Sequence, residues 1–365
     1  MMVSQTVPAW FERLRTRVST VFWFLGAAAF LLSLPLVFQA SPIIPFAIFC
    51  ISVASAALLA GISQKLRHNG FSKRFWLKAA VAISFVLTIF VASPIYYAAT
   101  ITQVSPALVP QATLSNGRKT IIFQGMQHVA TEIFFKSVIY DLEDELSRGS
   151  VAYYEGVRPS NPKDDMWFDN IITGGADLGD AYRALGDVCG LKFQGGYFGL
   201  LGRDVQEHPT AHVVADVTTT QLRAEFERLL RTDPAFAAAM KEKADVRRVD
   251  DGNGLEKIVS FLRRGSKGQR EIAGILCRGF MTYGMRHSGI GASDDQMNKL
   301  ILDYRNRVLA AALLAEPQQR IYVTYGAEHL PGVLALLRKA DPRWRTVSVK
   351  WTRTIDSPEQ LVGKL

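Results

Sequence analysis

Acidic side chains are almost missing from the first 100 residues of this 365-residue chain. Glu12 is the only carboxylate there, whereas the same stretch holds eight lysines and arginines. The stretch therefore carries +7 of the formal net charge of +9, and the rest of the chain is nearly neutral. Because a nucleic-acid surface needs basic residues clustered on a folded domain, the sequence argues against nucleic acid as a partner.

Cysteine is scarce, and several common catalytic motifs are absent. The chain has three cysteines and no Cys-x-x-Cys pair, so it lacks a thiolate zinc pattern. It also has no Gly-x-Ser-x-Gly motif of serine hydrolases and no glycine-rich phosphate loop. Cys189 and Cys277 lie in the C-terminal part, where they either form a disulfide or stay free and buried.

Charge is likewise missing from three long apolar stretches. They cover residues 21–38, 43–62 and 76–98, and Lys78 is the single exception. Each stretch approaches the ~20 residues that a helix needs to cross a bilayer. We therefore expect residues 1–100 to form a membrane anchor of three transmembrane helices, with the lipid bilayer as a partner.

Basic residues flank these stretches unevenly. Three arginines precede the first stretch, residues 65–74 between the second and third carry four basic residues, and residues 39–45 carry no charge. The positive-inside rule then predicts a cytoplasmic N-terminus. Three spans place the remainder on the opposite side. The sequence thus predicts a multi-pass protein of the bacterial inner membrane with a periplasmic or extracellular C-terminal domain.

The rest of the chain alternates strand and helix patterns. Residues 101–118 are polar, contain two prolines and are expected to be a linker. Residues 119–365 are expected to be the exported domain. A strand at 119–124, a helix at 130–147 and a strand at 151–154 form a unit typical of parallel strand pairs.

Further elements extend this pattern to the C-terminus. Ser293–Gln296 has the form of a capping box for a helix that ends near Leu314. The other expected elements are a strand at 212–217, helices at 219–231, 255–264 and 270–283, and strands at 321–324 and 346–351. The sequence predicts an α/β fold with a mixed, partly parallel sheet flanked by helices.

Two segments of this domain share the form Gly-x-x-His. They are Gly125–His128 and Gly326–His329, and each follows an apolar run of strand character. We expect each glycine to turn the chain sharply, with a positive φ, so that each histidine opens a helix. Since ligands of open α/β sheets lie at the carboxyl ends of the strands, His128 and His329 are candidates for one shared site.

Two charged residues are candidates to complete that site. Glu155 ends a strand in the run Tyr-Tyr-Glu-Gly, where it is either a solvated carboxylate, a general base or the third member of a His-His-Glu metal set. Arg305 cannot lose its proton, so it is suited to stabilising a negatively charged intermediate. Arg307 should face another direction. His208 and His212 have metal-ligand spacing, but Pro209 argues against a helix there.

In this order, the motifs resemble those of the TraB/PrgY/GumN superfamily, which includes the membrane-tethered TIKI metalloproteases and is related to the erythromycin esterase-like hydrolases. The resemblance covers about residues 119–351, and its most specific piece is the closing His-Leu-Pro-Gly run that begins at His329. It implies a site made of His128, Glu155, Arg305 and His329, and hydrolytic activity in some members.

We therefore expect a membrane-anchored hydrolase that cleaves a peptide or ester bond of a peptide or small-molecule substrate. In one version, His128, His329 and Glu155 hold a divalent ion such as manganese, cobalt or zinc, which activates water. In a metal-free version, a histidine paired with Glu155 activates the water directly. The alternative is a membrane protein that binds or sequesters a peptide signal without turnover.

Overall fold

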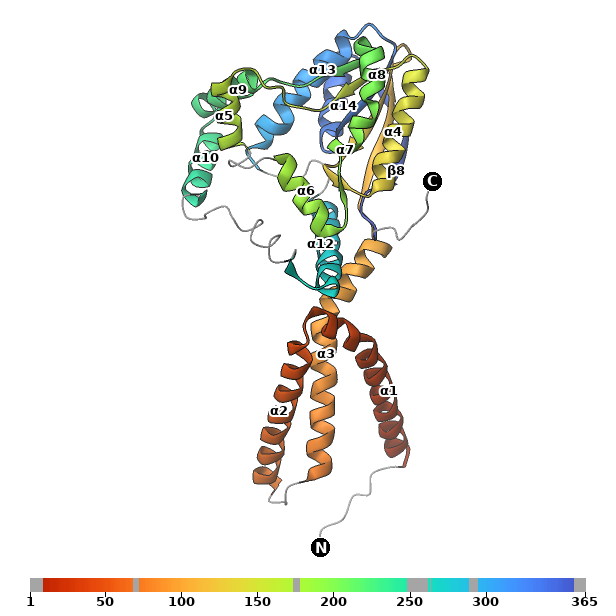
Figure 1. Cartoon of the computed structure of the whole chain (residues 1–365), viewed down its shortest axis with the longest axis vertical. Coiled ribbons are helices and arrows are strands. Elements are labelled where there is room, and N and C mark those ends of the chain that lie inside the picture. The colour runs from red at the N-terminus through yellow and green to blue at the C-terminus, as the bar shows by residue number, and fades with distance from the viewer. Residues whose placement is uncertain are drawn as a thin grey trace. The chain divides into compact units, whose positions relative to one another are not determined.

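The computed structural model describes residues 9–67, 72–172, 178–247, 262, 264–288 and 295–357. The chain divides into two compact units (Figure 1). Residues 1–99 and 265–276 form the first unit, and residues 100–264 and 277–365 form the second.

The first unit contains three long apolar helices. They are α1 (Ala9–Ala40), α2 (Ile43–Arg67) and α3 (Lys73–Val104), and all three are long and apolar enough to cross a membrane. The Tyr96 hydroxyl of α3 donates to the Leu32 carbonyl of α1 (2.8 Å), and the rings of Phe30 and Phe85 stack with centroids 4.8 Å apart. The three predicted helices are therefore present, and their length and apolar composition support a membrane-anchored protein.

The second unit is built on a six-stranded mixed sheet with the order β6-β4-β7-β2-β1-β8. Strands β6, β4, β7 and β2 are mutually parallel, whereas β1 runs antiparallel to both of its neighbours. The strands are β1 (Leu108–Ser115), β2 (Thr120–Met126), β4 (Val151–Tyr154), β6 (His212–Val214), β7 (Arg320–Gly326) and β8 (Arg345–Arg353). The predicted α/β fold with a partly parallel sheet is confirmed.

The expectation of a linker at 101–118 is wrong for β1. Its Val109, Ala112 and Leu114 side chains are buried, so the segment contributes to the core despite its polar composition. Pro110 is tolerated because the pairing of β1 with β2 begins only at Gln111, so Pro110 has a strand partner on one side alone, Trp351 of β8. Helix α3 also extends into this segment, since it ends at Val104.

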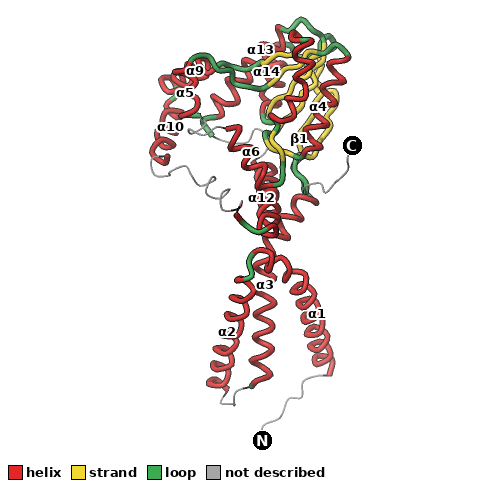
Figure 2. Tube along the Cα trace, in the orientation of Figure 1, coloured by secondary structure: helices red, strands yellow, loops and turns green. Residues whose placement is uncertain are grey.

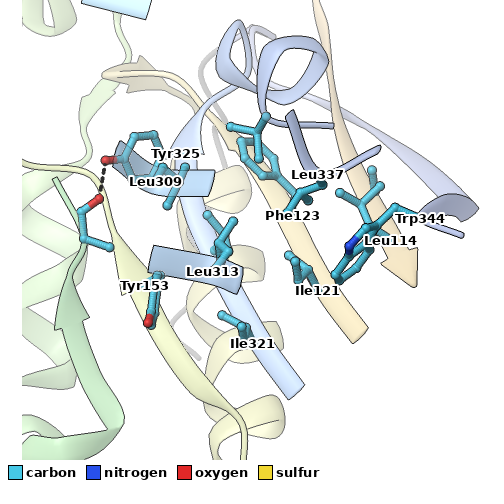
Figure 3. Packing of buried hydrophobic residues seen from close by; sticks show 14 of the residues in the cluster. Leu114, Ile121, Phe123, Tyr153, Leu309, Leu313, Ile321, Tyr325, Leu337 and Trp344 are labelled. Carbon is cyan, nitrogen blue, oxygen red and sulfur yellow. Dashed lines mark hydrogen bonds between the residues drawn. The ribbon is translucent and has the colours of Figure 1, made fainter. Parts of the chain in front are cut away.

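Helices cover both faces of the sheet (Figure 2). On one face, Phe123, Tyr153, Val323 and other alternate residues pack against α13 (Arg305–Ala315) and α14 (His329–Ala340) (Figure 3). On the other face, Tyr322 and its neighbours pack against α4 (Glu132–Ser147). Because side chains of a strand alternate between faces, strands enclosed in this way are apolar at nearly every position, as in Ile321–Tyr325.

The remaining helices lie between β4 and β7 in the sequence. They include α5 (Pro162–Ile171), α6 (Leu178–Cys189), α7 (Gly195–Phe198), α8 (Gly202–Glu207), α9 (Thr219–Thr232), α10 (Pro234–Arg247), α12 (Lys267–Ser288) and the π-helical turn η3 (Lys299–Tyr304). A small second sheet pairs β3 (Val129–Ala130) with β5 (Lys192–Phe193). Most of the predicted helix at 255–264 and the start of the Ser293–Gln296 capping box fall outside the described residues.

Cys189 and Cys277 form a disulfide within the second unit. Of the two alternatives that the sequence left open, the structure therefore shows the bonded one. The Arg278 guanidinium also donates to the Cys189 carbonyl (2.5 Å), so the end of α6 is tied to α12 by two adjacent interactions.

The two Gly-x-x-His segments end neighbouring parallel strands. The register pairs Gly125 with Tyr325 and Met126 with Gly326, so the motifs are offset by one residue. Neither glycine is among the described glycines with positive φ. A Cβ on Gly125 would instead lie 2.8 Å from the Pro110 carbonyl oxygen. The positive φ suggested for these glycines is thus wrong, and Gly125 is required because another backbone approaches closely.

Candidate functional site

His128, Glu155, Arg305 and His329 line one pocket of about 340 Å³. It lies at the carboxyl ends of β2, β4 and β7, where open α/β sheets place their ligands. Residues that are separated by up to 201 positions in the sequence therefore meet at one point. The structure brings all the predicted site residues together, and their chemical roles stay predictions.

Glu155 lies at the centre of this arrangement, directly after β4. Its backbone N–H donates to the Thr324 carbonyl (3.0 Å), which continues the pairing of β4 with β7. One carboxylate oxygen, Oε2, accepts from the Gly326 N–H (2.6 Å), and the other, Oε1, accepts from Arg305 Nη2 (2.8 Å). The side chain is 20% exposed, so it is held firmly and still reaches the pocket.

Arg305 is held by a second carboxylate, Asp216, which the sequence reading did not select. Its Nε and Nη2 donate to the two oxygens of Asp216 (3.0 and 2.5 Å), while Nη2 also reaches Glu155. Asp216 is fully buried and accepts from the N–H groups of Gly156 and Val217 (3.0 and 2.8 Å). Two carboxylates and one guanidinium give this cluster a net charge of −1.

A π-helical turn precedes Arg305. It covers Lys299–Tyr304, and such turns occur frequently at functional sites. Arg305 and Asn306, the first residues of α13, are both buried, and they contact different partners of the site. Arg307 points elsewhere and donates to Glu225 (2.8 Å), as expected from its position two residues later.

His329 is the first residue of α14 and is buried, with 3% of its surface exposed. Its Nδ1 pairs with the side-chain oxygen of Asn306 (2.7 Å). Asn306 packs against Gly332, one turn along α14, where a Cβ would overlap the Asn306 amide nitrogen. This contact explains physically why a glycine follows His329 by three residues.

The partner of Nδ1 determines the protonation pattern of His329. Since the Asn306 oxygen only accepts, Nδ1 carries the proton of a neutral ring and Nε2 presents a lone pair. The Nε2 atom lies 3.8 Å from Glu155 Oε1. Two acceptors therefore face each other across a gap that a donor of two hydrogens, such as water, is suited to bridge.

His128 does not open a helix, unlike His329, because β3 and not α4 follows it. His128 is exposed, and its imidazole ring stacks on the Tyr182 ring with centroids 4.4 Å apart. Its Nδ1 lies 2.8 Å from Gln194 Nε2, and its carbonyl accepts from the Gln194 N–H (3.0 Å). His128 is thus attached to the segment that follows α6.

The surroundings shift the acid–base properties of the site. Burial would raise the pKa of the Glu155 carboxyl, but the Arg305 guanidinium and the Gly326 N–H hold it below its usual value. Asp216 behaves in the same way, because Arg305 outweighs its burial and lowers its pKa. Burial lowers the pKa of His329 to about 4, although Glu155 acts in the opposite direction. Both carboxylates are therefore ionised at neutral pH, and His329 is neutral.

The predicted metal set is not assembled among the described residues. No group of three His, Cys, Asp or Glu side chains there is arranged to hold one ion. Glu155 and His329 Nε2 could supply two ligands, but the Arg305 cation already occupies a position on Glu155 Oε1. The metal requirement stays a prediction.

Two further residues of the site, Asp216 and Asn306, have sequence positions that could have indicated them. Asp216 interrupts the apolar run Val213–Val217 at a strand end, which is the same signal that singled out Glu155. Asn306 directly follows Arg305. Tyr182 and Gln194 carried no comparable signal, because they reach His128 only through the folding of the irregular middle region.

Comparisons with protein-family models, curated proteins and solved structures find no match to this chain. The resemblance to the TraB/PrgY/GumN superfamily therefore rests on the motifs alone and stays a prediction. Any functional assignment depends on the geometry of the pocket.

We predict that Asp216→Ala strongly destabilises the second unit. The change leaves the Arg305 guanidinium with Glu155 as its remaining carboxylate and removes the acceptor of two buried N–H groups. Loss of one partner from a buried ion pair costs about 3–5 kcal/mol in the free energy of unfolding. The measurement is thermal and chemical denaturation of the full chain in detergent.

Asp144→Ala is the matched control. Asp144 pairs with Arg148 at 2.8 Å, but both side chains are more than half exposed. Such a pair is worth about 0.2–1 kcal/mol, so the control should unfold nearly as the wild type does. Equal stability of the Asp216 and Asp144 variants would show that the buried carboxylate does not hold the site together.

Proposed function

We propose that this protein is a membrane-anchored hydrolase whose second unit acts on the extracytoplasmic side. The observation that supports it most is the lone pair of His329 Nε2, which faces the Glu155 carboxylate at 3.8 Å inside a pocket that Arg305 also lines. A base, a carboxylate and a cationic donor in one pocket are the groups required to add water to a carbonyl.

In this proposal, His329 and Glu155 orient and deprotonate the attacking water. A water about 2.8 Å from each acceptor donates one hydrogen to Nε2 and one to Oε1. Its oxygen attacks the carbonyl carbon as Nε2 takes the first proton. The same proton then passes to the leaving nitrogen or oxygen, so the products are a carboxylic acid and an amine or an alcohol.

Arg305 stabilises the negative charge that develops on the carbonyl oxygen. Its Nε and Nη2 bind Asp216 and Glu155, and within the described residues Nη1 donates no hydrogen bond. Nη1 is thus available to the substrate while the guanidinium plane stays fixed by two carboxylates. A preorganised donor of this kind lowers the barrier most when it does not have to reorient during the reaction.

The resemblance to TraB/PrgY/GumN proteins favours a peptide bond, or an ester bond as in the related esterases. The pocket walls agree with a substrate that has apolar groups near the scissile bond, because Leu108, Val109, Met285, Ile301 and Leu302 line them. If a divalent ion is bound, His329 Nε2 and Glu155 are the residues that would hold it.

A peptide-binding protein without turnover is the second candidate. The stacked Tyr182–His128 pair and the apolar walls support it, since an aromatic and apolar pocket is typical of ligand recognition. The two functions differ in what the Glu155 carboxylate does, because a binding protein does not require a base beside His329.

We predict that Glu155→Gln and His329→Asn each lower the rate of hydrolysis by about a hundredfold or more, the usual contribution of a general base. The rate is measured on peptides or esters that the wild-type protein hydrolyses. Glu328→Gln is the matched control, because Glu328 lines the same pocket but, in the part of the chain that the structure describes, makes no hydrogen bond to Arg305 or His329. Its rate should stay within about twofold of the wild type.

Metal content is measured on the same preparations. Stoichiometric metal that disappears in His329→Asn would establish the metal version of the mechanism. Ligand binding that survives in all variants, with no turnover in the wild type, would contradict the hydrolase and support the binding protein.

We also infer that the second unit lies outside the cytoplasm. The basic residues that flank the membrane helices support this orientation, and so does the disulfide between Cys189 and Cys277, because disulfides persist in oxidising compartments. Alkaline phosphatase fused after residue 357 should be active in a bacterial host, and the same enzyme fused after residue 67 should be inactive. The reverse pattern of activity would show that the second unit lies in the cytoplasm and would contradict the inference.

A further inference from the structure

A second pocket adjoins the one that holds the candidate site. Its volume is about 260 Å³, and it shares Met126 and Glu155 with the first pocket. The Glu155 carboxylate therefore borders both spaces. A chain-like substrate with its scissile bond beside Glu155 would place one neighbouring group in each pocket.

The wall of the second pocket is aromatic. It is formed by Tyr154, Phe193 and Phe198, and the rings of Tyr154 and Phe198 meet edge to face with centroids 5.7 Å apart. The Phe193 ring stacks on Tyr182, which in turn stacks on His128. The second pocket and the candidate site are thus connected through one series of stacked rings.

A chain of hydrogen bonds holds Tyr154 in place. Its hydroxyl lies 2.7 Å from His212 Nδ1, and His212 Nε2 lies 2.7 Å from Asp204 Oδ2. Burial would raise the pKa of Asp204, but His212 and His208 hold it below its usual value, so the carboxylate only accepts. His212 Nε2 therefore carries the proton, and the Tyr154 hydroxyl donates to Nδ1. His208 and His212 therefore both bind the Asp204 carboxylate. As expected, no α-helix runs through Pro209, since α8 ends at Glu207.

We propose that this second pocket is a substrate subsite that binds one aromatic or large apolar side group next to the scissile bond. Its volume equals that of roughly nine water molecules at about 30 Å³ each, which suits a single large side chain. The aromatic wall favours an aromatic group, whereas the Glu155 anion at the boundary disfavours an acidic one. The term subsite depends on the proposed function, because it assumes that the neighbouring pocket hydrolyses the substrate.

The test measures binding without turnover. The probe is 4-fluorophenylacetamide, observed by fluorine NMR with the full chain in detergent. Phe198→Trp adds volume to the wall of the second pocket, and Ile301→Trp adds volume to the first. Probe affinity should fall about tenfold or more in Phe198→Trp and change by less than about twofold in Ile301→Trp.

A second variant covers the case in which Phe198→Trp does not fold. Phe193→Leu keeps an apolar wall but removes one aromatic face, so it should weaken the fluorophenyl probe severalfold. The affinity of cyclohexylacetamide, measured by its displacement of the fluorinated probe, should stay unchanged. Thermal melts establish that each variant is folded.

The outcomes separate this proposal from the proposed function. Probe binding that is unaffected by both Phe198→Trp and Phe193→Leu, or that is lost only in Ile301→Trp, overturns the subsite even if hydrolysis is observed. Probe binding that depends on Phe198 in a protein without any hydrolysis refutes the hydrolase and leaves a binding pocket for aromatic groups.

Discussion

The site depends on one guanidinium shared between two carboxylates. Arg305 Nη2 donates to both Asp216 and Glu155, and these residues follow β6 and β4, while the Gly326 N–H at the end of β7 binds Glu155 from the other side. Removing charges from water is costly, and their mutual attraction offsets this cost only when every partner is present. The cluster therefore fixes the relative positions of three strand ends and one helix. Since it keeps a net charge of −1 beside the neutral His329, it also sets the electrostatic environment of Glu155.

Close backbone packing allows this cluster to form. At Gly326, a Cβ would lie 3.3 Å from Glu155 Oε2 and 3.4 Å from the His329 ring, tighter than ordinary contacts. At Gly332, the absence of a side chain lets Asn306 reach His329 Nδ1 and set its protonation pattern. The motif Gly-x-x-His-x-x-Gly thus has a steric explanation in which each glycine leaves room for a contact of the candidate site. Only the second Gly-x-x-His segment has this geometry, so the two copies are similar in sequence and different in structure.

The sequence predicted the membrane helices and the parallel strands because long apolar runs and strand–helix alternation are local patterns. It also predicted that His128, Glu155, Arg305 and His329 meet, since carboxyl ends of parallel strands share one edge of a sheet. It failed for β1, whose proline and polar residues hide a buried strand. It also missed Asp216, although the end of an apolar run gives the same local signal there as at Glu155. Gln194 reaches His128 only through packing between segments far apart in the chain, and no local spacing reports such a contact.

The central claim is that Glu155 and His329 activate a water molecule for attack on a carbonyl carbon. The most direct measurement is digestion of a peptide and ester mixture by the full chain in water enriched in oxygen-18, followed by mass spectrometry of the products. The account predicts that one heavy oxygen enters each new carboxylate with the wild type and the Glu328→Gln variant, and that no labelled product forms with Glu155→Gln. Absence of labelled products with the wild type, or equal labelling with Glu155→Gln, would contradict the account.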